Sequence, residues 1–178
     1  MEKTFAKDFT KDYYKGLNGM YFFRILNTII DMGDLRSRNV KILDFGCGVG
    51  HLSKLLPGKV IGYDVNPKLT EIGDWKKADF DVVVANQVFI YMPKNELLGL
   101  LEDLHEHNPD VEMYVGISTQ GILNKMLRVF ADQRDSYADG KLSPKEEISI
   151  LRQKMNVMGK KNAFFMCDVY SLKFKNQG

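Results

Sequence analysis

The chain has 178 residues, which is enough for one domain with a sizeable core and short for two. Hydrophobic residues make up 44% and charged residues 27%, the balance of an ordinary globular protein. With 25 basic and 23 acidic side chains the formal net charge is +2, so bulk electrostatics do not favour nucleic acid as a partner. We expect residues 1–178 to form a single domain.

The compartment can also be predicted from the sequence. The first 14 residues mix charged side chains and lack the apolar core of a secretory signal. The most apolar stretch, residues 20–32, is interrupted by an arginine, an asparagine and an aspartate, and it cannot span a bilayer. Cys47 and Cys167 are expected to be free thiols, because a disulfide at Cys47 would block the glycine-rich segment around it. These features predict a cytoplasmic protein without a transmembrane segment.

The first 33 residues are predicted to be helical. Apolar residues recur at helical spacing over residues 20–30, and Gly33 with Asp34 ends that helix. An upstream piece at 7–14 is either a shorter helix or an arm. A buried strand over 40–44 then feeds a tight turn, a short helix begins near residue 52, and a second strand covers 59–64.

Strands and helices alternate through the rest of the chain. The strongly apolar run 81–85 predicts a parallel strand buried on both faces, followed by a helix after Pro93 and a strand over 111–117. Residues 122–130 have helical spacing, and Ser143-Pro-Lys-Glu146 predicts a capped helix running to about Met155. The tail, 163–174, is either one bent strand or a tight hairpin. The predicted fold class is α/β, a doubly wound and mostly parallel sheet with an antiparallel C-terminal edge.

The turn after the first strand reads Asp44-Phe-Gly-Cys-Gly-Val-Gly50. Glycines at alternate positions allow a sharp turn and a close approach of a ligand to the backbone. A dinucleotide fingerprint would need glycine at position 51, where the chain has His51, and no Gly-Lys-Ser/Thr of a P-loop follows. In open α/β sheets, ligands bind beyond the carboxyl ends of the strands, which is where this turn lies.

This turn resembles motif I of the class I S-adenosylmethionine-dependent methyltransferases. The resemblance extends from about Val40 to Pro93 and implies a Rossmann-like methyltransferase fold, methyl-transfer activity and S-adenosylmethionine as cofactor. By the same resemblance, Asp64 at the end of the second strand binds the ribose hydroxyls, and the loop after the strand 81–85 runs beneath the sulfonium end. The implied cofactor-binding set is Asp44, Gly46, Cys47, Gly48, Gly50, Asp64, Val65, Asn66, Asp74, Trp75, Asn86, Gln87 and Val88.

Several of these roles have structural alternatives. Only about sixteen residues separate Asp64 from Asp81, so the family's second helix must be shortened and its third strand short or missing. Asp74 and Trp75 are candidates for the adenine contacts, although the indole could instead be a core or surface side chain. Asp44 either contacts the methionine end through water or supports the loop backbone, and Cys47 is more readily a small loop filler than a reactive thiol.

The sequence contains no obvious strong base. Many small-molecule and lipid enzymes of the family carry a Glu-His pair after the fourth strand, where this chain has Ile90-Tyr91. Tyr91 and Gln87 are therefore the catalytic candidates, with His51 as a third polar possibility, and Tyr91 could equally be a core aromatic. No metal is expected, because the histidines are scattered and no Cys/His cluster has the spacing of a zinc site.

The acceptor is predicted to be a small molecule, with an apolar or lipid-linked hydroxylated compound as one option. The Asn/Asp-Pro-Pro-Tyr segment typical of nucleic-acid amine methyltransferases is replaced by Asn86-Gln-Val-Phe89, which disfavours nucleic acid. The insertion at 119–143 is long enough to form a substrate lid. A second hypothesis is a catalytically inactive cofactor-binding protein or partner subunit of the same fold. The oligomeric state has no signal in the sequence.

Overall fold

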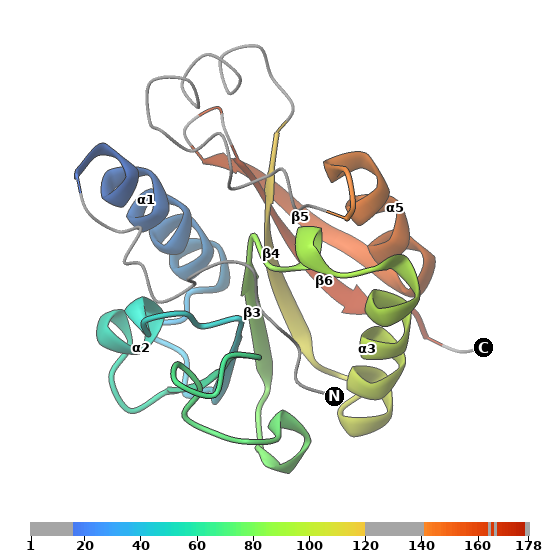
Figure 1. The fold of residues 1–178 in the computed structure, drawn as a ribbon, viewed down its shortest axis with the longest axis horizontal. Coiled ribbons are helices and arrows are strands. Elements are labelled where there is room, and N and C mark those ends of the chain that lie inside the picture. Colours follow the sequence, from blue (N-terminus) through green and yellow to red (C-terminus); the bar gives the residue numbers. More distant parts are fainter. Residues whose placement is uncertain (1–15, 120–140, 164, 166, 177–178) are drawn as a thin grey trace.

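The computed structural model describes residues 16–119, 141–163, 165 and 167–176 (Figure 1). The predicted segment 7–14, the predicted helix 122–130 and most of the predicted lid at 119–143 lie outside these residues. The elements in chain order are α1 (Gly16–Gly33), β1 (Ile42–Phe45), α2 (His51–Leu55), β2 (Val60–Tyr63), η1 (Trp75–Lys77), β3 (Val82–Asn86), η2 (Phe89–Tyr91), α3 (Lys94–His107), β4 (Glu112–Ser118), α5 (Pro144–Lys154), β5 (Met155–Ala163) and β6 (Cys167–Phe174).

The strands form one six-stranded sheet in the order β2-β1-β3-β4-β6-β5. Strands β1, β2, β3 and β4 are parallel, whereas β6 runs antiparallel to both β4 and β5. The predicted α/β class, with its antiparallel C-terminal edge, is confirmed. The strand order reverses between β1 and β3, and such a switch point opens a crevice at the carboxyl ends of the strands.

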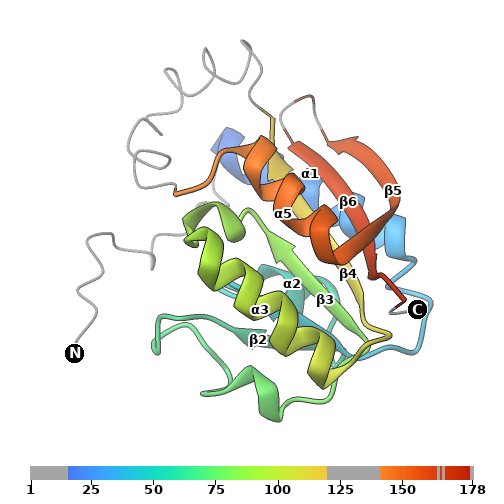
Figure 2. The same cartoon turned by 90° about the vertical axis from the view of Figure 1, so that its right-hand side faces the viewer.

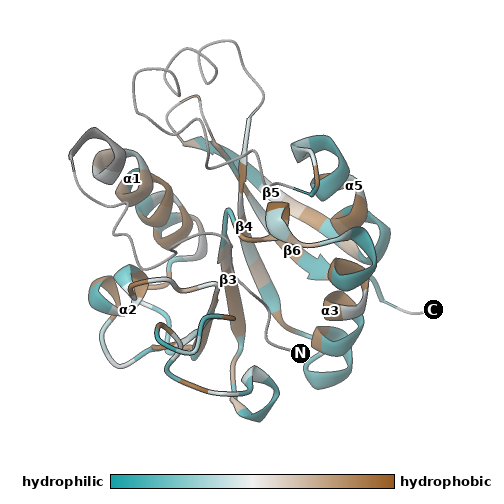
Figure 3. Ribbon diagram, viewed as in Figure 1, coloured by the Kyte–Doolittle hydropathy of each residue, from teal (hydrophilic) through white to brown (hydrophobic). Residues whose placement is uncertain are grey.

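Helices cover both faces of the sheet (Figures 1 and 2). On one face, α1 and α2 pack over Ile42, Val82 and Val84, and on the other α3 and α5 pack over Leu43, Val83 and Ala85. The helix surfaces that face the sheet are the apolar ones, as Figure 3 shows by colour. The alternation along β1 and β3 thus supplies two cores, which explains why both strands are apolar throughout.

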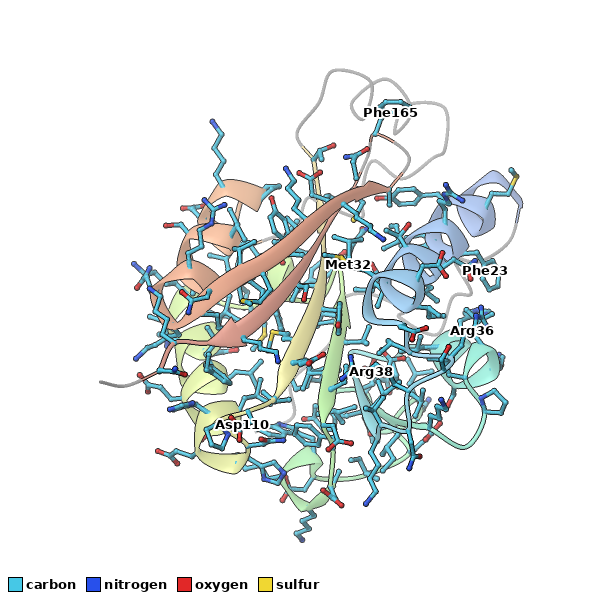
Figure 4. All side chains as sticks on the ribbon, turned by 180° about the vertical axis from the view of Figure 1, so that it is seen from behind. Phe23, Met32, Arg36, Arg38, Asp110 and Phe165 are labelled. Carbon is cyan, nitrogen blue, oxygen red and sulfur yellow. The ribbon has the colours of Figure 1, made fainter. Side chains whose placement is uncertain are left out.

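The N-terminal helix reaches across the sheet to the C-terminal hairpin. α1 contacts β3, β4, β5 and β6, and Met32 near its end lies over β5, where its Cε is 2.8 Å from the Cβ position of Gly159 (Figure 4). The helix ends at Gly33 as predicted, and Asp34 follows with a positive φ of 48°. No helix within the described residues is long and apolar enough to cross a membrane.

The connection between β2 and β3 is reduced, as the short spacing predicted. Residues 64–81 are all described, and they contain a single short helix, η1, and no strand. The connection folds back on β2, since the Glu71 amide donates to the Gly62 carbonyl at 2.9 Å. β2 is therefore the edge of the sheet on this side.

The C-terminal region differs from the prediction in one respect. Within the predicted tail, 163–174, the described residues contain one strand, β6, and only the last residue of β5. The hairpin spans Met155–Phe174, and its first strand, β5, was not predicted. Most residues of Met155–Ala163 are exposed, and the register shifts between Val157 and Gly159, so the alternation that identifies a strand is weak. The capped helix before it is confirmed: Ser143 and Glu146 form a full capping box.

Candidate cofactor and acceptor site

The three glycines of the turn after β1 have left-handed backbone conformations, with φ of 80° at Gly46, 53° at Gly48 and 71° at Gly50. Their surroundings differ. A Cβ on Gly46 would lie 2.4 Å from Val88 Cγ2, so this glycine lets the turn pack against the loop after β3. At Gly48 and Gly50, no heavy atom of the described residues, apart from their chain neighbours, lies within 4 Å of the Cβ position. The turn is therefore packed on one side and open on the other, where a ligand could approach the backbone.

The turn is held to the end of β2 by hydrogen bonds. The amides of Gly46 and Cys47 donate to the Tyr63 carbonyl at 2.7 and 3.0 Å. The Asp64 carboxylate accepts from the Gly48 amide at 3.0 Å and from the Asn66 amide at 2.9 Å, one on each oxygen. Each carboxylate oxygen can still accept a further bond, for example from a hydroxyl. Asp64 thus fixes the open glycine turn and keeps acceptor capacity beside it.

Three carboxylates gather below this turn. Asp44 is buried, and burial, then the nearby charges of Glu71 and Asp64, raise its pKa from 3.8 to about 7. The Glu71 carboxylate accepts from the Gly62 amide at 3.0 Å and from the Ser53 hydroxyl at 3.4 Å. Glu71 was not predicted as part of the site, because no local pattern places it next to Asp44. A cationic ligand would find favourable charge here.

Cys47 has the environment of a packing residue. Its thiol contacts the Leu69 carbonyl at 3.5 Å, and its sulfur lies 2.9 Å from the Cβ position of Gly62. Burial, followed by the charges of Asp44, Asp64 and Glu71, raises the pKa of the thiol to about 12. A thiol protonated at neutral pH is a poor nucleophile, which agrees with the loop-filler interpretation.

Asp74 and Trp75 lie in different environments. Trp75 is 6% exposed and packs among Phe45, Phe80 and His107, with ring centroids 6.1 to 6.3 Å apart. These contacts fit the core alternative and leave little of the indole for a ligand, so its stacking role remains only a prediction. Asp74 is exposed and caps η1 by accepting from the Lys76 amide at 3.1 Å. Its charge also acts on Tyr63, at the end of β2. Val65, next to Asp64, is 62% exposed.

The loop after β3 runs next to the glycine turn, through the contact of Val88 with Gly46. Gln87 has a positive φ of 57°, donates its backbone amide to the Gly116 carbonyl at 2.9 Å, and donates from Nε2 to the Tyr21 hydroxyl at 2.7 Å. Strain of this kind in a non-glycine residue is often found at functional sites. Asn86 instead turns its Oδ1 toward Gly116, where the atom is buried and has no hydrogen-bond partner among the described residues.

The remaining catalytic candidates lie at the same end of the sheet. Tyr91 is half-buried on η2, one turn after Val88, whose carbonyl accepts from its amide at 3.1 Å. His51 begins α2 and makes an edge-on contact with Phe23, the ring centroids being 5.3 Å apart. Within the described residues, no group of three His, Cys, Asp or Glu side chains is arranged to hold a metal ion.

Comparison with known proteins agrees with this geometry. The sequence matches the methyltransferase domain family over residues 21–140. No curated protein matches it significantly. Magnesium protoporphyrin IX methyltransferase from Synechocystis PCC 6803, solved with bound SAH, has a similar fold: the TM-score is 0.62 at 14% identity, over 94% of this chain and 91% of that chain.

Two further solved structures show the range of proteins with this fold. For N,N-8-amino-8-demethyl-D-riboflavin dimethyltransferase from Streptomyces davawensis, the TM-score is 0.63 at 18% identity, over 88% of this chain and 55% of that chain. For a small RNA methyltransferase, it is 0.60 at 14% identity, over 88% of this chain and 25% of that chain. At these identities the likeness concerns the fold.

Proposed function

The chain belongs to the methyltransferase domain family, and from this premise we propose that it methylates a small hydroxylated molecule. The protein is an S-adenosylmethionine-dependent methyltransferase of the class I fold. The small-molecule acceptor is supported by the near-neutral charge, by the absence of both prolines of the Asn/Asp-Pro-Pro-Tyr segment, and by neighbours whose names give a porphyrin and a flavin derivative as substrates. An apolar or lipid-linked acceptor remains within this proposal.

The residues present fit the cofactor. The observation that carries the proposal is the open side of the turn at Gly48 and Gly50, with the Asp64 carboxylate beside it. In our proposal Asp64 accepts hydrogen bonds from the ribose hydroxyls, and the glycine amides face the methionine end. When bound, the cofactor supplies a methyl group already activated on a sulfonium. The protein's part is then to orient the acceptor, exclude water and receive a proton.

A substitution at Asp64 tests the cofactor site. Asp64→Ala should weaken binding of S-adenosylmethionine by about 1–3 kcal/mol, because charge-assisted hydrogen bonds to the ribose are lost and the turn loses its anchor. Titration calorimetry with S-adenosylmethionine and its demethylated product measures this. Asp110→Ala is the matched control. Asp110 is exposed and precedes β4, so it lies at the amino ends of the parallel strands, opposite the edge that carries Asp64. Figure 4 shows it at the other end of the sheet from the hairpin tip at Phe165. Equal affinity of wild type and Asp64→Ala would place the ribose elsewhere.

A labelling experiment tests the acceptor class. Cell extract is divided into small-molecule, lipid, RNA and protein fractions, and each is incubated with the enzyme and methyl-labelled S-adenosylmethionine. We expect label in the small-molecule or lipid fraction. Label confined to RNA or protein would overturn the acceptor class, and cofactor binding without label in any fraction would favour the cofactor-binding subunit.

A further inference from the structure

Helix α5 carries a glutamate where its pattern calls for an apolar residue. The buried residues of this helix are Glu147, Ile150 and Leu151, spaced i, i+3, i+4 along the face that packs on the sheet. The Glu147 side chain is as inaccessible as its apolar neighbours, at 1% exposed. A buried carboxyl is costly unless it is paired, so its presence in an apolar stripe needs an explanation.

Among the residues that the structure describes, no group provides that explanation. The Oε1 atom of Glu147 is buried and has no hydrogen-bond partner among the described residues. Burial raises its pKa from 4.5 to about 8, and no charge on another described element offsets this. Several charged side chains on the elements packed against α5 have other partners: Lys94 on α3 acts on Glu146, Glu102 on α3 pairs with Lys154, Lys160 on β5 pairs with Asp168, and Glu112 on β4 pairs with Arg38 and Lys173. Tyr91 lies on η2, which also packs against α5.

The first turn of α5 lies at the carboxyl ends of the parallel strands, where the crevice opens (Figure 2). The amides of Lys141 and Leu142, just before the helix, both donate to the carbonyl of Ile90 on η2, at 2.8 and 3.2 Å. The start of α5 is thereby attached to the loop that follows β3. Glu147 is in the turn that begins there, so it is on the acceptor side of the fold.

The charge of Glu147 acts on a polar group at this edge. Cys167, at the start of β6, is paired in register with Ser118 at the end of β4. The charge of Glu147 contributes to raising the pKa of the Cys167 thiol, and Gln87 hydrogen-bonds that thiol. Gln87 in turn holds the Tyr21 hydroxyl. Glu147 is thus coupled through its charge to Cys167, and Cys167 is hydrogen-bonded to Gln87 in the loop that is expected to run beneath the sulfonium end of the cofactor.

We propose that Glu147 binds the hydroxyl of the methyl acceptor and takes up its proton during transfer. This inference rests on the proposed function. The acceptor oxygen uses an electron pair to bond to the methyl carbon, the bond from that carbon to sulfur breaks with its pair left on sulfur, and the O–H proton passes to the Glu147 carboxylate. The acceptor class is a neutral molecule with a hydroxyl group, which does not ionise by itself at neutral pH.

The experiment compares Glu147→Gln and Glu147→Leu with the wild type. The control is Glu146→Gln on the same helix turn, because Glu146 is exposed and glutamine can also serve in a capping box. Transfer from methyl-labelled S-adenosylmethionine to the extract fraction labelled by wild type is measured from pH 6 to 9, with calorimetry of cofactor binding in parallel. We expect the wild-type rate to rise with pH up to about 8, and both Glu147 variants to be about 10²–10⁴-fold slower with unchanged cofactor affinity.

A second readout needs no acceptor. If Glu147 serves catalysis, Glu147→Leu should raise the melting temperature, since an unpaired buried carboxyl is replaced by an apolar side chain in an apolar stripe. A residue with a structural role would lower it. Transfer by Glu147→Gln within twofold of wild type, or a lower melting temperature for Glu147→Leu, would overturn the inference. Absence of transfer by the wild type would instead refute the proposed function, and the inference with it.

Discussion

The ionisation of the Asp44 carboxyl depends on its burial and on the neighbouring carboxylates. Its sequence position, before the glycine turn, predicted a site residue but left open whether it contacts the ligand or the loop. The structure adds the two carboxylates that act on it, Asp64 and Glu71, and its burial. No pattern in the sequence indicates Glu71, because its position depends on how the β2–β3 connection folds back. The sequence therefore predicts the acid before the turn but not its altered ionisation.

The affinity for S-adenosylmethionine should increase between pH 6 and 8. Asp44 is mostly protonated below a pKa of about 7, and its ionised form attracts the positively charged sulfonium and ammonium groups. Titration calorimetry at fixed ionic strength measures the change. Asp44→Asn should abolish most of the pH dependence, and an affinity that is constant over this range in wild type would contradict the expectation.

Glu147 and Trp75 show why side-chain roles are harder to predict than side-chain types. Trp75 follows an acid in the expected adenine region, yet the short connection brings it into the aromatic cluster with Phe45. Glu147 was predicted only as part of the capped helix that runs to about Met155. A signal was present, since it falls three and four residues before Ile150 and Leu151, and the neighbouring Glu146 already completes the cap. Helical periodicity could have shown that one of the two glutamates is buried.

At the scale of elements, the glycine turn and the capped helix were predictable because their signals are local. Left-handed turns favour glycine, and a Ser-Pro-x-Glu start is specific to a helix. β5 was not predictable, because it is a largely exposed edge strand stabilised by pairing with β6. Its existence depends on a partner that comes later in the chain, and pattern-based reasoning is weakest for such strands.

Two of the glycines should respond differently to alanine. Gly46→Ala places a Cβ 2.4 Å from Val88 Cγ2 in addition to its left-handed backbone, whereas Gly48→Ala meets no atom within 4 Å. We expect about 1–2 kcal/mol of destabilisation for Gly48→Ala from the backbone alone, and about 1–3 kcal/mol more for Gly46→Ala from overpacking. Urea denaturation measures both. Val88→Ala should recover part of the loss in Gly46→Ala, and equal losses at the two glycines would contradict the packing argument.

At the scale of the whole molecule, two buried acids affect stability together. Asp44 and Glu147 have folded-state pKa values of about 7 and about 8, against ordinary values of 3.8 and 4.5. Between the ordinary and the raised value, the folded state holds a proton that the unfolded state has released. The stabilisation is complete below the ordinary pKa and is lost as the pH rises through the raised one.

The free energy of unfolding should therefore decrease from pH 5.5 to 8. Each of the two acids lowers it by up to about 1.4 kcal/mol per pH unit within its window. Urea denaturation at several pH values measures this in the cofactor-free protein. The Asp44→Asn, Glu147→Gln double variant should show a flatter profile. A stability that rises with pH in this range would show that neither acid is protonated in the folded state.

The position of α1 over the C-terminal hairpin has a consequence for folding during synthesis. The helix is made first, but its apolar residues Ile25, Ile29 and Ile30 are covered by a sheet that includes β6, the last strand. A chain still on the ribosome has no complete surface for α1 until β6 has emerged. Until then the apolar face of α1 stays exposed, and in this state chaperones can bind and aggregation can begin. Chains that lack the hairpin should be degraded or aggregate, even though the glycine turn itself lies between β1 and α2.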